Sequence, residues 1–139
     1  MAFDYSTSEF PWVTVETFGF TRGVPETVTG CLLVDLRGVT FDDPANEEAL
    51  RGRDGKDADV VQYVLASKGA FTKLSEITRQ AKALLDSNAT RNLTLRILIG
   101  DDNGSTRAVV VGDAVAEVLT ARGIPTEVEH RHLPEAAQK

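Results

Sequence analysis

The residues best suited to chemistry in this chain lie in one short stretch between Ile97 and Arg107. An apolar run ends there at a glycine, and polar residues lead into a pattern of helical periodicity. A strand, a glycine loop and a helix N-terminus in this order can bind small ligands, because glycines permit close approach and the first helical N–H groups are unpaired. The candidate binding residues in this loop are Gly100, Asp101, Asp102, Asn103, Gly104, Ser105, Thr106 and Arg107.

The loop differs from the P-loop of nucleotide-binding proteins. Three residues separate Gly100 from Gly104 where a P-loop has four, and no lysine follows. Asp101 and Asp102 add negative charge where a helix N-terminus offers only about half a positive charge. Three hypotheses follow: a ligand with hydroxyl or amino groups, a metal bridged by the aspartates, or an anion site that has lost its function. A plain turn, with Asp and Asn as turn-forming residues, explains the same pattern.

Further candidate residues at expected strand ends and in loops are Arg37, Arg51, His130 and Arg131. The other cations in such positions are Arg22, Arg53 and Lys56, and the arginines are expected to share one pocket. Ligands of parallel sheets bind outside the carboxyl ends of the strands, so we expect Arg37, the 100–107 loop and residues 130–131 to converge on an anion pocket. His130 and His132 would share one side of a strand, but no further His or Cys completes a metal site. We expect no metal and no cofactor. An acid–base enzyme using Asp101 or Asp102 with His130 stays open.

The elements that must position these residues follow from hydrophobic periodicity. Strands are predicted near 12–18, 31–37, 93–99 and 126–133, and helices near 57–69, 70–87 and 106–122. Ser105 or Thr106 is the expected cap of the last helix. The continuous apolar run of the second strand predicts burial on both of its faces. The order predicts an α/β fold: a single mixed or mostly parallel sheet of about four strands, with helices packed on it.

Composition limits the class of protein. The 139 residues predict one domain at 13–133, preceded by a flexible arm at 1–12 and followed by a polar tail at 134–139. A net charge of −6 disfavours nucleic-acid binding through the overall field. The single cysteine, the lack of a signal peptide and the lack of a membrane-spanning apolar run indicate a cytoplasmic protein without a membrane partner.

Several stretches, taken in order, resemble one family. Residues 17–25 and 34–37 are similar to the opening of the C-terminal domain of the RNase adapter RapZ, with its Ser-Phe-Gly-Phe-Lys-x-Gly-x-Pro and Phe-Asp-Val-Arg motifs. Residues 50–57 resemble its Leu-Arg-x-x-Thr-Gly-x-Asp, and residues 99–108 lie where the family has Ile-Gly-Cys-Thr-Gly-Gly-x-His-Arg-Ser. The pairs 122–123 and 130–131 match its final Arg-Gly and His-Arg. The likeness runs from about residue 13 to 133.

The resemblance implies a stand-alone version of that domain, without the P-loop domain of the full family. Our first hypothesis is a non-enzymatic regulator or ligand sequestrant that binds a phosphorylated sugar or nucleotide-like metabolite, and a phage or other mobile element is one hypothesis for its origin. Family members bind glucosamine-6-phosphate at the glycine loop and contact a small RNA. Because two carboxylates replace neutral residues of the family loop here, the alternative is a protein or RNA adapter with a vestigial pocket. Self-association into a homo-oligomer also stays open.

Overall fold

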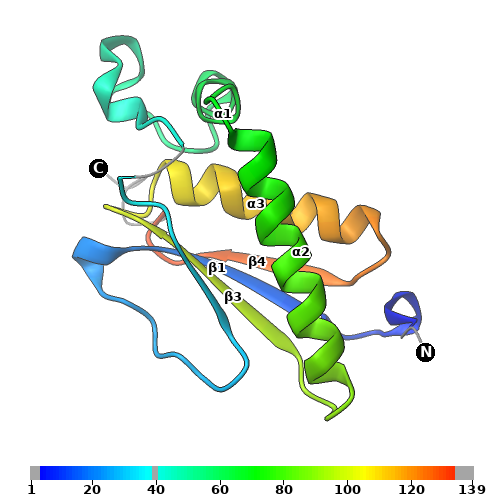
Figure 1. Ribbon diagram of the computed structural model, residues 1–139. Coiled ribbons are helices and arrows are strands. Elements are labelled where there is room, and N and C mark those ends of the chain that lie inside the picture. Colours follow the sequence, from blue (N-terminus) through cyan, green and yellow to red (C-terminus); the bar gives the residue numbers. More distant parts are fainter. Residues whose placement is uncertain (1–3, 39–40, 134–139) are drawn as a thin grey trace.

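The computed structural model describes residues 4–38 and 41–133. In this part of the chain a sheet of four parallel strands carries helices on one face (Figure 1). The strands are β1 (Val13–Gly19), β2 (Leu32–Asp35), β3 (Leu95–Asp101) and β4 (Thr126–His130). The α-helices are α1 (Ala58–Leu65), α2 (Ala70–Ala89) and α3 (Arg107–Ala121). The predicted α/β class is confirmed.

The strand order is β2-β3-β1-β4, so the two central strands are β3 and β1. In the register, Val13 of β1 lies opposite Leu95 of β3 and Thr126 of β4. All pairs are parallel, and the carboxyl ends of the four strands therefore meet at one edge. The helix α3 begins at this edge, directly beyond the end of β3.

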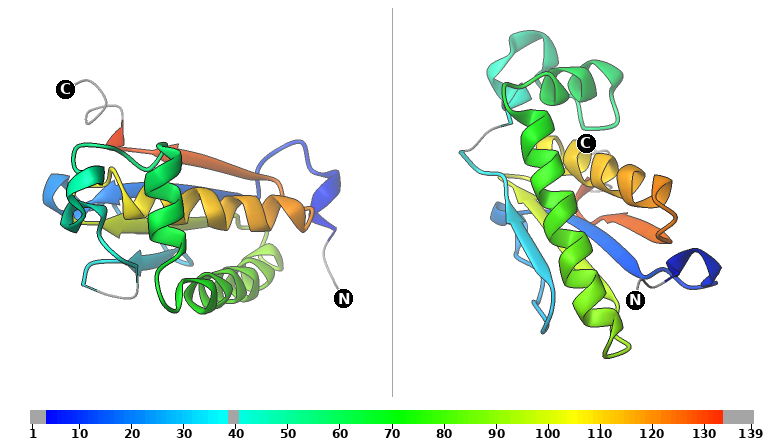
Figure 2. Two further views of the ribbon diagram at one scale, coloured as in Figure 1. Left: turned by 90° about the horizontal axis from the view of Figure 1, so that it is seen from above. Right: turned by 45° about the vertical axis from the view of Figure 1, so that its right-hand side comes forward.

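The hydrophobic core lies between the sheet and the helices. Alternate residues of the central strands, such as Val15 and Ile97, pack with Leu85 of α2 and Val115 of α3 in one buried cluster. Two views confirm that α2 and α3 lie on the same face (Figure 2). Gly112 lets α3 approach β1 closely, because an added Cβ would lie against the side chain of Thr17. The site is thus built on a rigid two-layer base.

The opposite face of the sheet carries a buried ion cluster. Glu16 is held by Arg96 of β3 and by Arg131, which follows β4. Arg96 also donates to the backbone carbonyl of Glu26, so the connection from β1 to β2 crosses this face. The hydrogen bonds from Arg96, which outweigh the opposing effect of burial, and those from Arg131 lower the pKa of Glu16.

One predicted environment was wrong. The apolar run at 31–37 predicted a strand buried on both faces, but β2 lies at the edge of the sheet and Leu33 is 46% exposed. An edge strand has a neighbour on one side only, and the helices cover only one of its faces. Hydrophobicity alone does not distinguish these two environments.

Most of the predicted N-terminal arm lies within the described residues. In the stretch predicted as a flexible arm, Tyr5 of the short 3-10 helix η1 (Tyr5–Thr7) is buried, donates a hydrogen bond to Asp86 and lies edge-on to Trp12. Burial and the Asp86 contact raise the pKa of Tyr5. The predicted tail at 134–139 lies outside the described residues. Within the described ranges, no helix has the length and hydrophobicity needed to cross a membrane.

Candidate functional site

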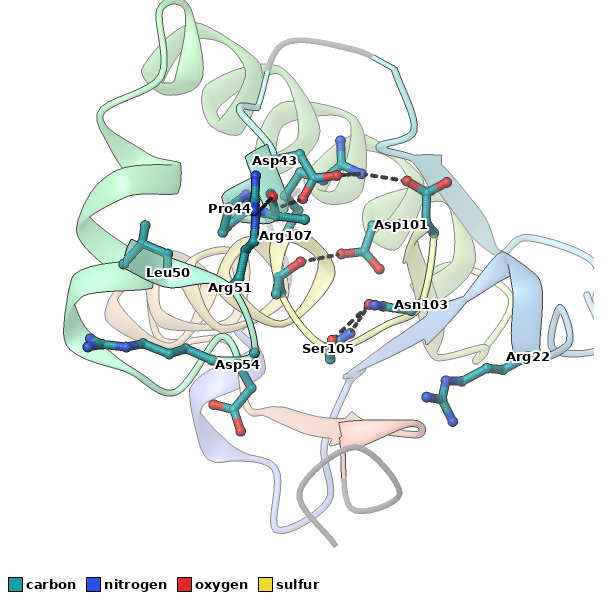
Figure 3. Close-up of a pocket in the computed structure, with 15 residues that line it drawn as sticks. Arg22, Asp43, Pro44, Leu50, Arg51, Asp54, Asp101, Asn103, Ser105 and Arg107 are labelled. Carbon is teal, nitrogen blue, oxygen red and sulfur yellow. Dashed lines mark hydrogen bonds and ion pairs between the residues drawn. The ribbon is translucent and has the colours of Figure 1, made fainter. Parts of the chain in front are cut away.

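A cavity of about 670 Å³ lies at the carboxyl end of β3. One wall is the loop from Asp101 to Arg107, and the other is formed by residues 43–45 and 50–54 (Figure 3). The second wall includes the 3-10 helices η3 (Pro44–Asn46) and η4 (Glu48–Leu50). Arg22, in the 3-10 helix η2 (Phe20–Arg22), lies on a third side. We refer to these as the loop wall (101–107) and the insert wall (43–54).

The side chain of Asp101 points into its own loop. One carboxylate oxygen accepts from the backbone N–H of Gly104, and the other accepts from the N–H of Ala108 at 3.1 Å. The Thr106 hydroxyl, at 3.3 Å, donates to that second oxygen. Asp101 is only 1% exposed. Thr106 occupies the expected N-cap position of α3 but makes no capping bond with its side chain, and Asp101 accepts the helix N–H of Ala108 instead.

The neighbouring residue Arg107 is a buried cation that joins three segments. Its Nη1 donates to the carbonyl of Leu36, just after β2, at 3.2 Å. Its Nη2 lies 3.0 Å from the Asp102 carboxylate and 3.5 Å from that of Asp43. The Nε atom is buried and has no hydrogen-bond partner among the described residues. Arg107 thus holds the loop wall, the end of β2 and the insert wall together.

Two glycines permit the close contacts around the loop wall. Gly104 has φ +79°, and an added Cβ would lie 2.6 Å from the backbone nitrogen of Gly19 at the end of β1. Gly55, just after the insert wall, donates its N–H to the carbonyl of Ser105 at 2.7 Å. A Cβ at Gly55 would lie 2.7 Å from the backbone oxygen of Thr106. Close packing at both positions therefore requires glycine.

The insert wall presents cations that differ in how they are paired. Arg53 forms ion pairs with Asp57 and Asp59, and both contacts lie away from the loop wall residues. Arg51 uses Nε to donate to the carbonyl of Ala45 at 2.9 Å. Among the described residues, no carboxylate lies within ion-pair distance of Arg51, although the residue is exposed and lines the cavity. Its terminal nitrogens can therefore receive an anionic group of a ligand.

The predicted site residues fall into three groups. Those that line the cavity are Arg51, Asp101, Asp102, Asn103, Ser105, Thr106 and Arg107. Gly100 and Gly104 shape the loop from behind, since an added Cβ at Gly100 would meet the rings of Phe18 and Phe20. Arg37, His130 and Arg131 do not line this cavity. The expected convergence of the arginines on one pocket therefore holds for Arg22, Arg51, Arg53 and Arg107, and it fails for Arg37 and Arg131.

Arg37 and Arg131 have other partners. The guanidinium of Arg37 forms a bidentate pair with Asp35, which lowers the pKa of that carboxyl, and lies over the ring of Phe20, 3.6 Å from its centroid. Arg131 pairs with Glu16 on the face of the sheet opposite the helices. Both contacts stabilise the ends of strands rather than form the cavity surface.

His130 lies in a chain of polar contacts behind α3. Its Nε2 is 2.9 Å from Asp113, and its Nδ1 is 2.7 Å from the Thr17 hydroxyl. Lys56 completes the chain by pairing with Asp113 at 2.8 Å. Burial opposes ionisation of Asp113, but the hydrogen bonds from His130 and Lys56 outweigh it and lower the pKa of the carboxyl. These contacts tie the end of the insert wall to α3 and β4.

The two histidines do not act together. His132 accepts the backbone N–H of Gly19 through Nδ1 at 2.8 Å, whereas His130 bonds to Thr17 and Asp113. No cluster of His, Cys, Asp and Glu suited to a metal ion occurs among the described residues. The H-x-H spacing is explained by these two separate structural contacts.

Sequence reasoning missed two charged residues that line the cavity, Asp43 and Asp54. The cluster of cations at 51–57 was a visible signal, but its proximity to the 100–107 loop was not, because the two segments are joined only through tertiary contacts such as Gly55 to Ser105. The cavity lining contains four arginines and four aspartates, so it is polar and close to neutral overall.

The parallel sheet, with a polar cavity at the carboxyl ends of its strands and a helix starting beside it, places the chain in the class of α/β domains with a site at the strand ends. A family model described as the RapZ C-terminal domain matches residues 11–134. The chain therefore belongs to the RapZ C-terminal domain family.

Relatives of this chain carry the name nucleotide-binding protein. One from Sphingopyxis alaskensis is 32% identical over 129 residues, which cover 92% of this chain and 40% of the relative. One from Mycolicibacterium smegmatis is 32% identical over 136 residues, covering 95% of this chain and 45% of the relative. One from Gloeobacter violaceus is 32% identical over 127 residues. The chain thus spans about two fifths of the length of these relatives.

Proposed function

We propose that this domain binds a small phosphorylated sugar or nucleotide-like metabolite in the cavity between the loop wall and the insert wall, without changing it chemically. The observation that carries the proposal is the meeting of these two walls at the carboxyl end of β3, around about 670 Å³ of polar space. Cavities of this size suit small-molecule ligands, and α/β sheets bind ligands at this edge.

Arg51 is the group best placed to receive the anionic part of such a ligand. Its terminal nitrogens face no carboxylate among the described residues, and a guanidinium matches the geometry of a phosphate. Asn103, Ser105 and Thr106 line the opposite side with amide and hydroxyl groups suited to sugar hydroxyls. A non-enzymatic role fits this inventory, since the described lining includes no His, Cys or Lys and the Asp101 carboxylate is bonded to the backbone of its own loop.

The relatives' name supports a small-molecule ligand in general terms. It belongs to proteins of which this chain spans about two fifths, so a nucleotide ligand for this domain is part of the proposal. We propose that the domain acts as a cytoplasmic regulator or as a ligand sequestrant.

Thermal unfolding with a panel of ligands tests the proposal. We expect at least one sugar phosphate or nucleotide to raise the melting temperature, with a stabilisation of about 2.7 kcal/mol at a hundredfold excess over Kd. The parent sugars and nucleosides without phosphate serve as ligand controls. Arg51→Ala should abolish the response, whereas Arg91→Ala, an exposed arginine beyond α2, should retain it. A flat response across the whole panel would refute the proposal.

A protein or RNA adapter with a vestigial pocket is the second candidate. It is favoured by the internal contacts of Asp101 and Arg107, which use polar groups that a ligand would otherwise meet. In that case Arg51→Ala leaves thermal unfolding with ligands unchanged but weakens capture of the partner. Salt dependence of capture distinguishes the partners, because RNA binding weakens steeply with added salt.

A further inference from the structure

We propose that Asp101 is a specificity-determining residue of the cavity: its carboxylate acts as an internal anion that occupies the N-terminus of α3 and excludes a ligand phosphate from it. The inference rests on the proposed function and deepens it. It states at which wall of the same cavity the negative charge of the ligand is bound.

The contacts of Asp101 are those that a bound anion would make. Backbone N–H groups at a helix N-terminus hold phosphate or carboxylate ions in many proteins. Here the N–H groups of Gly104 and Ala108 and the hydroxyl of Thr106 all donate to the Asp101 carboxylate. Both carboxylate oxygens are used, and the residue is almost fully buried. An anion from solvent therefore finds these donors already occupied.

The charge balance gives the same answer. A helix N-terminus carries about half a positive charge, and the full negative charge of Asp101 more than offsets it. Asp102 adds a second carboxylate to the loop wall, and its charge is matched by Arg107. A phosphate placed beside α3 would thus meet net negative charge, and it would find the N–H groups of Gly104 and Ala108 already bonded to Asp101.

The ligand is consequently oriented by the difference between the walls. Its phosphate binds to Arg51 on the insert wall, since Arg51 forms no ion pair with a described carboxylate. Its uncharged hydroxyl-bearing part faces Asn103 and Ser105 on the loop wall. This orientation selects ligands whose anionic group and hydroxyl groups lie at opposite ends.

Rescue by small anions tests the role of Asp101. In Asp101→Ala the donors of Gly104 and Ala108 lose their acceptor, so the melting temperature should fall. Adding inorganic phosphate or formate in millimolar amounts should then raise it by about 4 °C. The wild-type protein and Glu117→Ala keep the carboxylate at the α3 N-terminus, so they should gain less than Asp101→Ala, and any gain they show should disappear when Arg51→Ala is added. Glu117 is an exposed residue of the same helix, so its replacement removes the same charge without touching the N-terminus.

Two further measurements keep the test decisive if Asp101→Ala does not fold. Asp101→Asn retains the side-chain size and should show a smaller rescue by the same anions. In the wild-type protein, amide NMR signals of Gly104 and Ala108 should stay in place when inorganic phosphate is added. Saturable shifts of those two signals, or the absence of any rescue in a folded Asp101 variant, would overturn the inference.

The proposed function can fail separately. If no phosphate ester stabilises the wild-type protein, ligand binding is refuted, yet rescue of the Asp101 variants still reports whether the carboxylate occupies the α3 terminus.

Discussion

The two walls of the cavity differ in where their polar groups are used. In the loop wall, Asp101 and Arg107 are buried and bonded to backbone groups of their own neighbourhood. In the insert wall, Arg51 and Arg53 are exposed, and Arg51 contacts the protein through a single nitrogen. A wall whose groups bond internally provides stability, whereas a wall with available groups provides recognition.

This difference separates residues that resemble a binding motif from residues that can bind. Gly100 to Arg107 has the composition of a ligand loop, yet its most polar side chains hold the loop itself in shape. The insert wall has no regular motif, yet it offers Arg51, a cation that forms no ion pair with a described carboxylate. Substitutions in the loop wall should therefore mainly lower stability, and substitutions in the insert wall should mainly weaken the response to ligand.

The largest effect on stability is expected for Arg107→Ala. The change leaves the carbonyl of Leu36 and the carboxylates of Asp43 and Asp102 without their donor. Removing one partner of a buried ion pair costs about 3–5 kcal/mol, and the 60% exposure of the Asp102 side chain favours the lower end, about 3 kcal/mol. Urea denaturation measures it. Arg51→Ala, from the other wall, should change stability by less than about 0.5 kcal/mol; equal losses would contradict the difference between the walls.

A smaller loss is expected for Gly55→Ala, which affects the contact between the walls. Its new Cβ would lie 2.7 Å from the backbone oxygen of Thr106, so the insert must move away from α3. Overpacking of this kind costs about 2 kcal/mol. Amide hydrogen exchange gives a local readout, because the N–H of residue 55 is bonded to Ser105 in the wild type and should lose its protection. Retained protection together with unchanged stability would show that the contact is not a constraint.

Much of the fold could be predicted from sequence because it depends on local patterns. The apolar runs near 93–99 and 126–133 correspond to β3 and β4, and the periodicity after Thr106 corresponds to α3. The first helix was predicted to begin near residue 57. Asp57 is the N-cap of α1, and its side chain accepts the N–H groups of Asp59 and Val60. The position of β2 at the sheet edge could not be predicted, because strand order depends on how distant segments pack.

The candidate site was predictable only in part for the same reason. The loop at 100–107 could be predicted from its glycines and from its place between a strand and a helix. The direction of the Asp101 side chain could not be predicted, because an aspartate in such a loop can face a ligand or cap the helix with the same sequence. Arg37 and Arg131 have the positions expected of pocket residues, but each forms an ion pair elsewhere. Arg37 pairs with Asp35 at the end of the preceding strand, β2, and Arg131 pairs with Glu16 of the neighbouring strand β1.

The smallest effect is expected for Asp113→Asn, which loosens the end of the insert wall. Asp113 accepts from His130 and Lys56, and its lowered pKa means that the folded state prefers the ionised carboxyl. This contribution is present above the ordinary pKa of an aspartate and is lost as the pH falls through the lower pKa of the folded state. Because the side chain is 37% exposed, solvent screening limits the contribution to below about 1 kcal/mol. Denaturation of wild type and variant at neutral and acidic pH should give curves that converge in acid. A constant gap at every pH would mean that Asp113 acts through packing, and the insert wall would then be held to α3 by Gly55 and by the Arg107–Asp43 ion pair.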